Sequence, residues 1–185
     1  MPYQTTCPSD HIPLCQINRL KGYAMNFSEK TLKILHECGW TEDRFLHPDT
    51  FVVKLTNAGY KPHAAALEFL QRFGELKISF LADTKGYKEL EGHMRSCNFK
   101  IDNTISSCDI DDIEDYGNCI GTILCPVGEM ETCSIIAVAE DGRVFSYFNP
   151  YVCLDAMNYI EAIEKYCTEG APIKRLVYDG NPLLF

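Results

Sequence analysis

The chain has 185 residues, enough for one domain with a single hydrophobic core but not for two full domains. Its 26 acidic residues outnumber its 17 basic ones, and the formal net charge of -9 excludes direct binding of nucleic acid as an expected function. No segment has the apolar length of a membrane span or of a signal-peptide core, which favours a cytoplasmic protein without a membrane partner.

The ten cysteines are numerous for a chain of this length. Several lie inside apolar helix or strand patterns, where a reduced cysteine acts as a small hydrophobic residue. We therefore expect free thiols in a reducing compartment. A secreted, disulfide-bonded form is the alternative.

The N-terminal 26 residues contain three prolines and no lasting periodicity, which predicts an extended arm. The first helix is expected to begin after Ser28, a good N-cap residue. Phe27 before this cap and Leu32 in the first turn form a hydrophobic staple, and Gly39 ends the helix.

Two more helices are predicted, one from Pro48 to Gly59 and one from Pro62 to Gly74. The third helix has apolar residues at the i, i+3, i+4, i+7 spacing of a single buried face. These residues are Ala66, Phe69, Leu70 and Phe73.

The period changes at Leu76, where alternating apolar residues up to Ala82 predict a strand. Residues 83–98 are polar and show no clear pattern. Further strands are expected at 120–125, 132–139 and 143–148, with the last two joined by a hairpin at Asp141-Gly142. Helical spacing returns from about Leu154 to Thr168, before Gly170.

Helices first, an antiparallel meander next and a helix last predict an α+β fold, with the sheet packed against N-terminal helices and a C-terminal helix. Three short motifs stand out along this order. They are Gly39-Trp40-Thr41-Glu42-Asp43-Arg44, Phe69-Leu70-Gln71-Arg72-Phe73-Gly74-Glu75-Leu76, and Pro126-Val127-Gly128 followed by Asp141-Gly142-Arg143-Val144-Phe145.

The order and spacing of these motifs resemble the third subgroup of the SUKH superfamily. The resemblance covers residues 27–170, which leaves an N-terminal arm at 1–26 and a C-terminal tail at 171–185. It implies a bacterial immunity protein that binds a cognate toxin domain, often a nuclease, and neutralises it without chemistry of its own. Many members have Phe-Gly-Gly-Leu where this chain has Phe73-Gly74-Glu75-Leu76, so the turn into the first strand is expected to differ here.

Negative charge is concentrated between Glu75 and Glu140, where 13 acidic and five basic residues give a net charge of -8. The densest run is Cys108–Tyr116, which Ile110 and Ile113 could anchor while its carboxylates face water. Such a surface could imitate a phosphate backbone and bind the cationic cleft of a nuclease. The candidate partner-binding residues are Asp109, Asp111, Asp112, Glu114, Asp115, Glu129 and Glu131.

Other interpretations of this acidic run stay open. It could be a solvated loop without a partner, as acidic runs usually are. A calcium site is not expected, because the glycine and closing glutamate of an EF-hand loop are missing.

Aromatic residues provide a second set of candidates. We expect Trp40 to pack at a helix–loop junction, Arg44 to act as a structural hydrogen-bond donor, and the stripe formed by Phe69, Leu70 and Phe73 to lie in the core. Aromatic residues near the last hairpin could include an exposed anchor for a partner. They are Tyr147, Phe148, Tyr151 and Tyr159.

Enzymatic function has little support in the sequence. Cys7, His11 and Cys15 could supply three zinc ligands, but the pattern offers no close fourth ligand, so no metal or cofactor is expected. The sequence contains no Gly-x-Ser-x-Gly motif, no phosphate-binding glycine loop and no zinc-deaminase motif. We therefore predict a non-enzymatic, monomeric or weakly dimeric toxin-binding protein, with a regulatory protein-binding adaptor or, less favoured, a small hydrolase or transferase as the alternatives.

Overall fold

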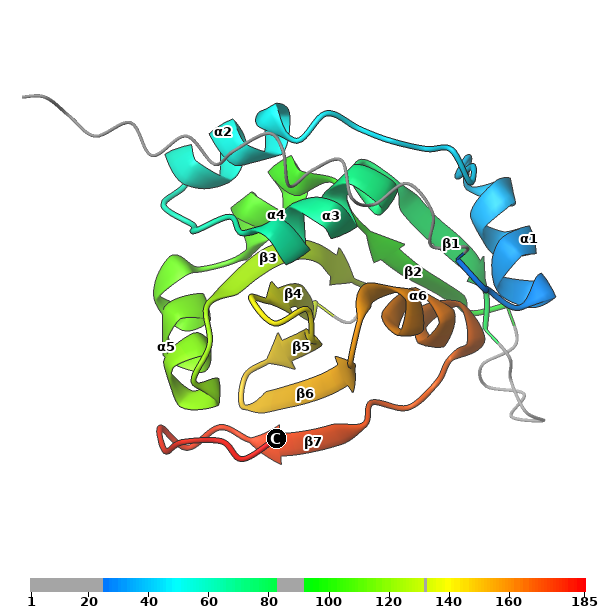
Figure 1. Cartoon of the computed structure of the whole chain (residues 1–185). Helices are drawn as coiled ribbons and strands as arrows, with labels where there is room; N and C mark the ends of the chain where they lie inside the picture. Colours follow the sequence, from blue (N-terminus) through cyan, green and yellow to red (C-terminus); the bar gives the residue numbers. More distant parts are fainter. Residues whose placement is uncertain (1–24, 83–91, 132) are drawn as a thin grey trace, which may run out of the picture.

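The computed structural model describes residues 25–82, 92–131 and 133–185 (Figure 1). Within these ranges, six helices and seven strands follow one another along the chain. The helices are α1 (Glu29–Glu37), α2 (Asp49–Asn57), α3 (Ala64–Phe73), α4 (Ile101–Ser107), α5 (Ile110–Ile120) and α6 (Tyr159–Thr168). The strands are β1 (Lys77–Leu81), β2 (Met94–Asn98), β3 (Leu124–Met130), β4 (Ile135–Ala139), β5 (Val144–Phe148), β6 (Tyr151–Ala156) and β7 (Lys174–Val177).

All seven strands form one antiparallel sheet, in which each strand pairs with its neighbours in sequence. The connections β3–β4, β4–β5 and β5–β6 are short turns, whereas α4 and α5 lie between β2 and β3 and α6 lies between β6 and β7. The α+β fold and its antiparallel sheet are therefore confirmed.

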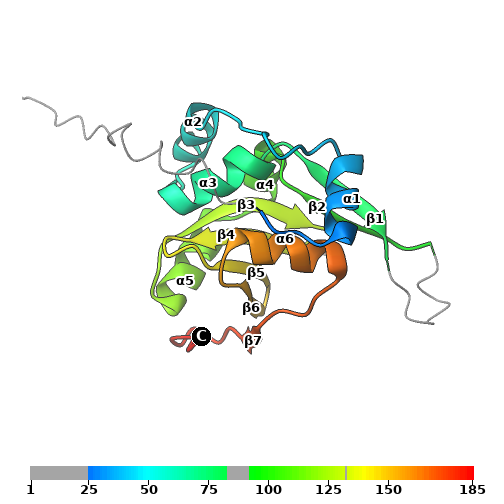
Figure 2. The same ribbon diagram turned by 45° about the vertical axis from the view of Figure 1, so that its right-hand side comes forward.

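The helices cover the two faces of the sheet unequally. Helices α1, α3 and α6 lie together on one face, as the two views in Figures 1 and 2 show. Neighbouring residues of a strand point to opposite faces, so Ser146 and Tyr147 of β5 mark the two sides. Tyr147 packs against Tyr116 of α5, with ring centroids 4.6 Å apart, which places α5 on the face opposite α6.

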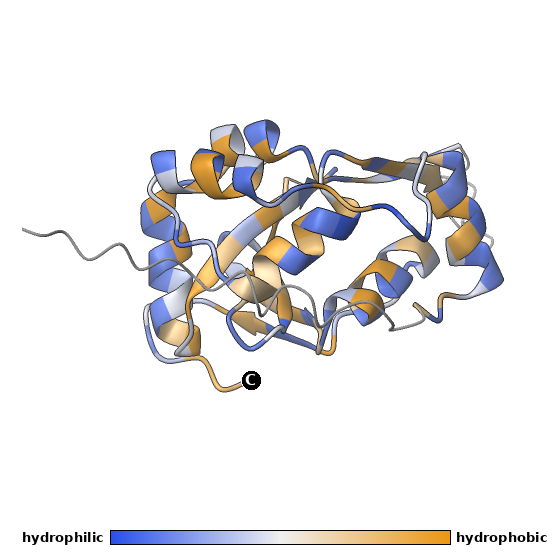
Figure 3. Ribbon diagram, turned by 45° about the horizontal axis from the view of Figure 1, so that its top comes forward, coloured by the Kyte–Doolittle hydropathy of each residue, from blue (hydrophilic) through white to orange (hydrophobic). Residues whose placement is uncertain are grey.

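The core lies on both faces of the central strands. All five residues of β4 are buried, and four of the five in β5 are buried. The helices carry hydrophilic and hydrophobic residues in alternation along their length (Figure 3), as expected for helices with one buried face. No helix in the described ranges is long and apolar enough to cross a membrane.

The first three helices agree with the sequence prediction. The Ser28 hydroxyl accepts a hydrogen bond from the Thr31 N–H and caps α1, which ends before Gly39. Helix α3 starts two residues later than expected, because His63 and not Pro62 provides its N-cap. Its predicted buried face is confirmed, since Ala66, Phe69, Leu70 and Phe73 are all inaccessible to solvent.

Several predicted boundaries are wrong. The strand expected at 120–125 begins only at Leu124, because Ile120 ends helix α5. The helix expected from Leu154 begins at Tyr159, and Leu154 lies instead in strand β6. Residues 174–177, expected in a C-terminal tail, form β7 and pair with β6. The predicted arm at 1–26 lies almost entirely outside the described residues.

Candidate functional site

The acidic run of the sequence forms a helix, α5, and not a loop. Asp109 caps it by accepting a hydrogen bond from the Asp111 N–H at 3.0 Å, and two further aspartates in the first turn suit the positive end of the helix dipole. Ile113, Tyr116 and Gly117 are buried on the side facing the sheet. The helix ends at Gly121, which takes the left-handed conformation with φ 78°.

Close packing fixes α5 against the sheet. A Cβ atom at Gly117 would be 2.8 Å from the Thr122 carbonyl oxygen, in the turn that follows α5, and 3.7 Å from the Leu124 nitrogen at the start of β3. Tyr116 is 2% exposed and packs against both Tyr147 and Tyr178. The carboxylates on the outer side of α5 are therefore held on a rigid support.

The structure brings together five of the seven candidate carboxylates. Asp109, Asp111, Asp112, Glu114 and Asp115 are all exposed on the first two turns of α5 or at its cap. Within the described part of the chain only Glu114 forms an ion pair, with Lys61 at 3.1 Å, and both side chains are exposed. Such a pair contributes little to stability. Asp109 is engaged as the N-cap, so within the described residues three carboxylates, those of Asp111, Asp112 and Asp115, form no side-chain hydrogen bond or ion pair.

A small cavity lies beside these carboxylates, between α5 and the turn after α2. It has a volume of about 150 Å³, and Tyr60, Ile110, Ile113 and Glu114 are among the residues that line it. An apolar side chain of a partner could occupy it while charged groups pair at its margin. Charge patterning in the sequence located the carboxylates but gave no sign of this cavity.

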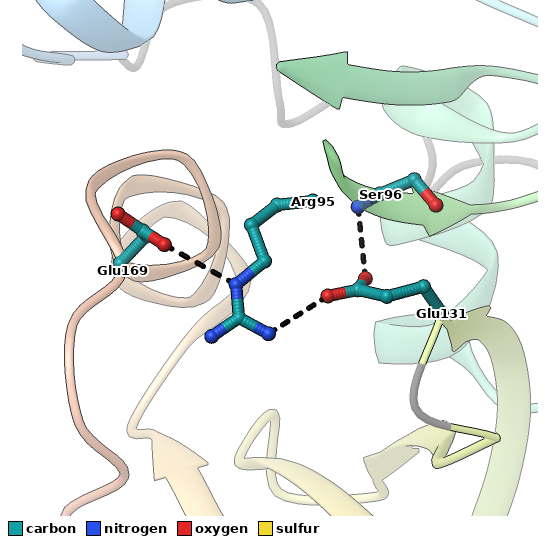
Figure 4. A network of polar contacts seen from close by, with 4 residues as sticks. All are labelled: Arg95, Ser96, Glu131 and Glu169. Atoms are coloured by element: carbon teal, nitrogen blue, oxygen red, sulfur yellow. Dashed lines mark hydrogen bonds and ion pairs between the residues drawn. The ribbon is translucent and has the colours of Figure 1, made fainter. Parts of the chain in front are cut away.

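The other two candidates, Glu129 and Glu131, lie at the opposite end of β3. The Glu129 carboxylate accepts a hydrogen bond from the Asn98 side-chain amide at 2.9 Å. Glu131 accepts hydrogen bonds from Arg95 at 2.9 Å and from the Ser96 N–H at 2.8 Å (Figure 4). Burial opposes ionisation of Glu131, but these two donors together lower its pKa below the usual range. Both carboxylates therefore already have partners inside the molecule.

The aromatic candidates divide into buried and exposed groups. Trp40 is 1% exposed and stacks on Phe73 with ring centroids 6.0 Å apart, as expected for a packing residue. Tyr147 is buried, and the half-buried Tyr159 donates its hydroxyl hydrogen to Glu68. Phe148 and Tyr151 are the exposed members, at 37% and 36%.

Arg44 has the expected structural role. Its guanidinium group donates to the Gly74 carbonyl at 2.8 Å, and its own carbonyl accepts from Arg72 at 3.2 Å. These bonds tie the loop after α1 to the end of α3.

The cysteines of the described ranges are all free thiols. Burial raises the pKa of Cys125 and of Cys167 to about 12, so both thiols stay protonated near neutral pH. They behave as small hydrophobic residues, in agreement with the sequence prediction. Cys7, His11 and Cys15, the zinc candidates, lie outside the described residues, and no group of metal-binding side chains is found within them.

Comparison with known proteins gives one match. A family model described as SUKH-3 immunity protein matches residues 27–168, from the staple residue before α1 to the last residue of α6. No curated protein and no solved structure matches the chain.

Proposed function

Because this match covers most of its length, the chain belongs to the SUKH-3 immunity protein family, and we propose that it binds a cognate protein toxin and neutralises it without catalysing a reaction. The toxin is a nuclease domain, and the immunity protein blocks its substrate cleft. The exposed carboxylates of α5 form the contact surface. They are Asp109, Asp111, Asp112, Glu114 and Asp115.

The observation that carries this proposal is the concentration of carboxylates on the outer side of one helix, where the described residues form a single ion pair with them. A nuclease must hold a polyanionic substrate in a cationic cleft, so a surface of fixed negative charges is complementary to it. Complementary charge raises the rate of association and makes that rate sensitive to salt. The cavity beside Ile110 and Ile113 would accept an apolar anchor from the toxin.

Glu129 and Glu131 are not part of the proposed surface. Their carboxylates are engaged with Asn98, Arg95 and Ser96, and a partner would have to break those bonds to reach them. Their expected effect on toxin binding is therefore smaller than that of the α5 carboxylates.

The test replaces the five carboxylates of α5 by the corresponding amides in one variant. Asparagine is as good an N-cap as aspartate, so Asp109→Asn preserves the start of the helix. The cognate toxin is expected to be encoded by the adjacent gene. We expect its rate of association with the variant to fall about tenfold at low salt, and this rate to depend less on salt concentration. Stopped-flow mixing measures the rate, and co-expression with the toxin measures rescue of growth.

A control variant removes the same amount of charge elsewhere on the surface. It carries amides in place of Glu29, Glu37, Glu42, Asp43 and Glu140, all of which are exposed. This control should associate nearly as fast as the unmodified protein. Equal rescue and equal rates for both variants would show that α5 is not the contact surface.

A further inference from the structure

The two edges of the sheet differ in how they are covered. At the first edge, α1 packs beside β1, where the Ser79 N–H donates to the Cys38 Sγ at 3.4 Å and the same thiol donates to the Ser79 carbonyl at 3.9 Å. At the last edge, β7 pairs with β6, and no described helix or strand lies beyond it (Figure 1). An uncovered edge strand is a template on which another strand can pair.

The register of β7 shows which of its backbone groups point away from the sheet. The Tyr178 N–H donates to the Pro150 carbonyl at 2.6 Å, so Tyr178 faces β6. Because the direction alternates along an antiparallel strand, Leu176 also faces β6, whereas Arg175 and Val177 face outward. Among the described residues, the N–H and carbonyl groups of these two have no backbone partner.

A row of exposed apolar side chains leads to this edge. Phe148, Tyr151 and Val177 are register partners across β5, β6 and β7, so their side chains lie on the same face of the sheet. They are 37%, 36% and 58% exposed. Ile173, directly before β7, is 47% exposed. An apolar surface next to an uncovered edge is typical of a contact with another chain.

The basic side chains of β7 do not block the edge. Lysine and arginine often protect edge strands from pairing. Here Lys174 donates to the Leu184 carbonyl, and its Nζ lies 6.0 Å from the centroid of the Phe185 ring. The Arg175 guanidinium group lies over the Tyr151 ring, 5.9 Å from its centroid. Both side chains thus fold back onto their own chain and leave the outer backbone of β7 accessible.

We propose that β7 pairs with β7 of a second copy of this chain, antiparallel about a two-fold axis at Leu176. The outward-facing residues allow three registers. One sets Arg175 opposite Arg175 of the second copy, where like charges repel. Another sets Val177 opposite itself and needs residues 179–180, where Gly180 has φ 84° and the chain turns. The third sets Arg175 opposite Val177 and keeps the pairing within residues 174–178.

This third register makes the edge complementary to itself. Each pair of Arg175 with Val177 of the other copy exchanges two backbone hydrogen bonds, and the two-fold axis repeats the pair. The aliphatic part of Arg175 covers the exposed Val177 of the other copy. Asp179 of the other copy is a diagonal neighbour of Arg175, and a hydrogen bond from the Asn181 N–H lowers the pKa of its carboxyl group. Opposite charges in this position attract.

Sedimentation velocity of the full chain tests the proposal without the toxin. A contact between two short strands buries less than the roughly 1,600 Å² of a standard interface, so we expect a dissociation constant of about 10–100 µM. The mean sedimentation coefficient should rise from that of a monomer at about 5 µM to that of a dimer at about 1 mM. A chain that is still monomeric at the highest concentration would overturn the proposal.

Proline substitutions at the two edges locate the interface. Val177→Pro removes an outward N–H without affecting the pairing with β6, and it should raise the dissociation constant at least about tenfold. Leu81→Pro is the matched control on β1, because the Ala82 N–H donates to the His93 carbonyl and Leu81 therefore also faces outward. The control should dimerise like the unmodified chain. Equal weakening by both substitutions would exclude β7 as the interface.

A cysteine at the two-fold axis tests the register and keeps the proposal testable if the proline variant does not fold. In Leu176→Cys the two introduced thiols belong to residues whose Cα atoms lie about 4.5 Å apart, within the range of a disulfide. Mild oxidation followed by peptide mass spectrometry should detect this link, and Leu81→Cys should give none. A link in Val177→Cys but not in Leu176→Cys would contradict the axis at Leu176.

The alternative occupant of the edge is a strand of the toxin. In that case the free chain would stay monomeric, and the amides of Arg175 and Val177 would gain protection from hydrogen exchange only when the toxin is added. This result would contradict pairing between two copies. Dimerisation is measured in the absence of toxin, so loss of toxin binding in the α5 amide variant would leave this inference untouched.

Discussion

His63 contacts both α3 and β4, and its contact with α3 requires a neutral imidazole ring. Its Nδ1 accepts from the Ala66 N–H at 3.3 Å and caps α3, while its Nε2 lies 3.1 Å from the Val138 carbonyl of β4. The first bond needs an unprotonated Nδ1, so the hydrogen must be on Nε2 and the ring must be neutral. Protonation would remove the cap.

We predict that His63 makes the stability of the fold depend on pH. Burial lowers the pKa of His63 from its ordinary 6.5, although the Val138 carbonyl and the charges of Glu140 and Asp141 oppose the shift. As pH falls below 6.5 the unfolded chain binds a proton before the folded one does. The stabilisation that neutral His63 provides is therefore complete above pH 6.5, and it is lost as the pH falls through the pKa of His63 in the folded state.

Urea unfolding at a series of pH values tests this prediction with His63→Asn. Asparagine keeps an N-cap but cannot titrate, and it is too short to reach Val138 as the ring does. The variant should lose about 1 kcal/mol of unfolding free energy above pH 7 and a smaller amount at acidic pH. If the difference in unfolding free energy between the two proteins stays constant with pH, His63 is not the neutral, titrating residue that we infer.

Glu75 is the residue that replaces the second glycine of the Phe-Gly-Gly-Leu pattern. It takes the left-handed conformation with φ 64°, and its N–H donates to the Phe99 carbonyl at 2.9 Å. The turn has thus kept the backbone that suits glycine, although the side chain makes this conformation unfavourable. The glutamate therefore strains the turn but does not redirect it, because the chain still enters β1 directly after Leu76.

We predict that Glu75→Gly stabilises the protein by up to about 1 kcal/mol. The left-handed conformation costs a non-glycine residue about 1–2 kcal/mol, and the larger entropy of an unfolded glycine offsets about 0.5–1 kcal/mol of the gain. Glu75→Ala serves as the control, because it removes the carboxylate but keeps the strain. Thermal and urea unfolding should show that the Glu75→Gly variant is more stable than both the Glu75→Ala variant and the unmodified protein.

At the scale of elements, strand β3 needs a glycine at position 128, because Asn98 and Phe99 pack directly against its backbone there. The pairing of β3 with β4 shifts register between Pro126 and Gly128, within the Pro-Val-Gly motif. A Cβ atom at Gly128 would be 2.4 Å from the Phe99 ring and 3.0 Å from the Asn98 carbonyl oxygen. Phe99 is fully buried and packs edge-on against Phe69 of α3. The glycine therefore lets the chain before α4 lie directly on the sheet.

Gly128→Ala should destabilise the fold by about 1–3 kcal/mol through overpacking. A double-mutant cycle with Phe99→Leu isolates the clash, since the smaller side chain leaves room for the added methyl group. The alanine substitution should cost less in the Phe99→Leu background than in the unmodified chain. Equal costs in both backgrounds would place the strain at the Asn98 backbone instead of at the ring.

The sequence predicted elements best where capping and periodicity agree. Ser28 gave the start of α1, and the apolar spacing of α3 gave its buried face. Helix α5 was missed, although Asp109 is a good N-cap residue and the apolar residues that follow it have helical spacing, because its many carboxylates resemble those of a solvated loop.

The missed strands lacked the alternation by which strands are recognised. In β6 five consecutive residues from Val152 to Ala156 are buried, so both faces are covered and no polar side alternates with an apolar one. Edge strand β7 begins with Lys174 and Arg175, both exposed. A cavity that Asp155 lines was not predicted, because it needs residues from β2, β6, β7 and α6 together.

For the whole molecule, the sheet separates two surfaces of different electrostatic character. The α5 surface holds exposed carboxylates that salt can screen, whereas the other face holds Asp155 of β6, a carboxylate that is only 6% exposed. Salt should therefore weaken ionic contacts of the α5 carboxylates much more than the hydrogen bond between Tyr166 and Asp155. Substitutions at the two surfaces should also act independently, because they share no contacts.

We predict that Asp155 lowers the stability of the protein at neutral pH. Its folded pKa is about 6, against 3.8 in the unfolded chain, so the folded state binds more protons between these values. The favourable contribution is present below 3.8 and is lost as pH rises through about 6. At pH 7 Asp155→Asn should therefore be the more stable protein, by up to about 3 kcal/mol.

Urea unfolding of both proteins from acidic to neutral pH measures this difference, which should grow across the interval between the two pKa values. A more stable variant at neutral pH would show that the fold retains the carboxylate at a cost in stability. If Asp155→Asn is instead less stable at neutral pH, the carboxylate is compensated within the fold. It would then serve to hold β6 to α6 through Tyr166.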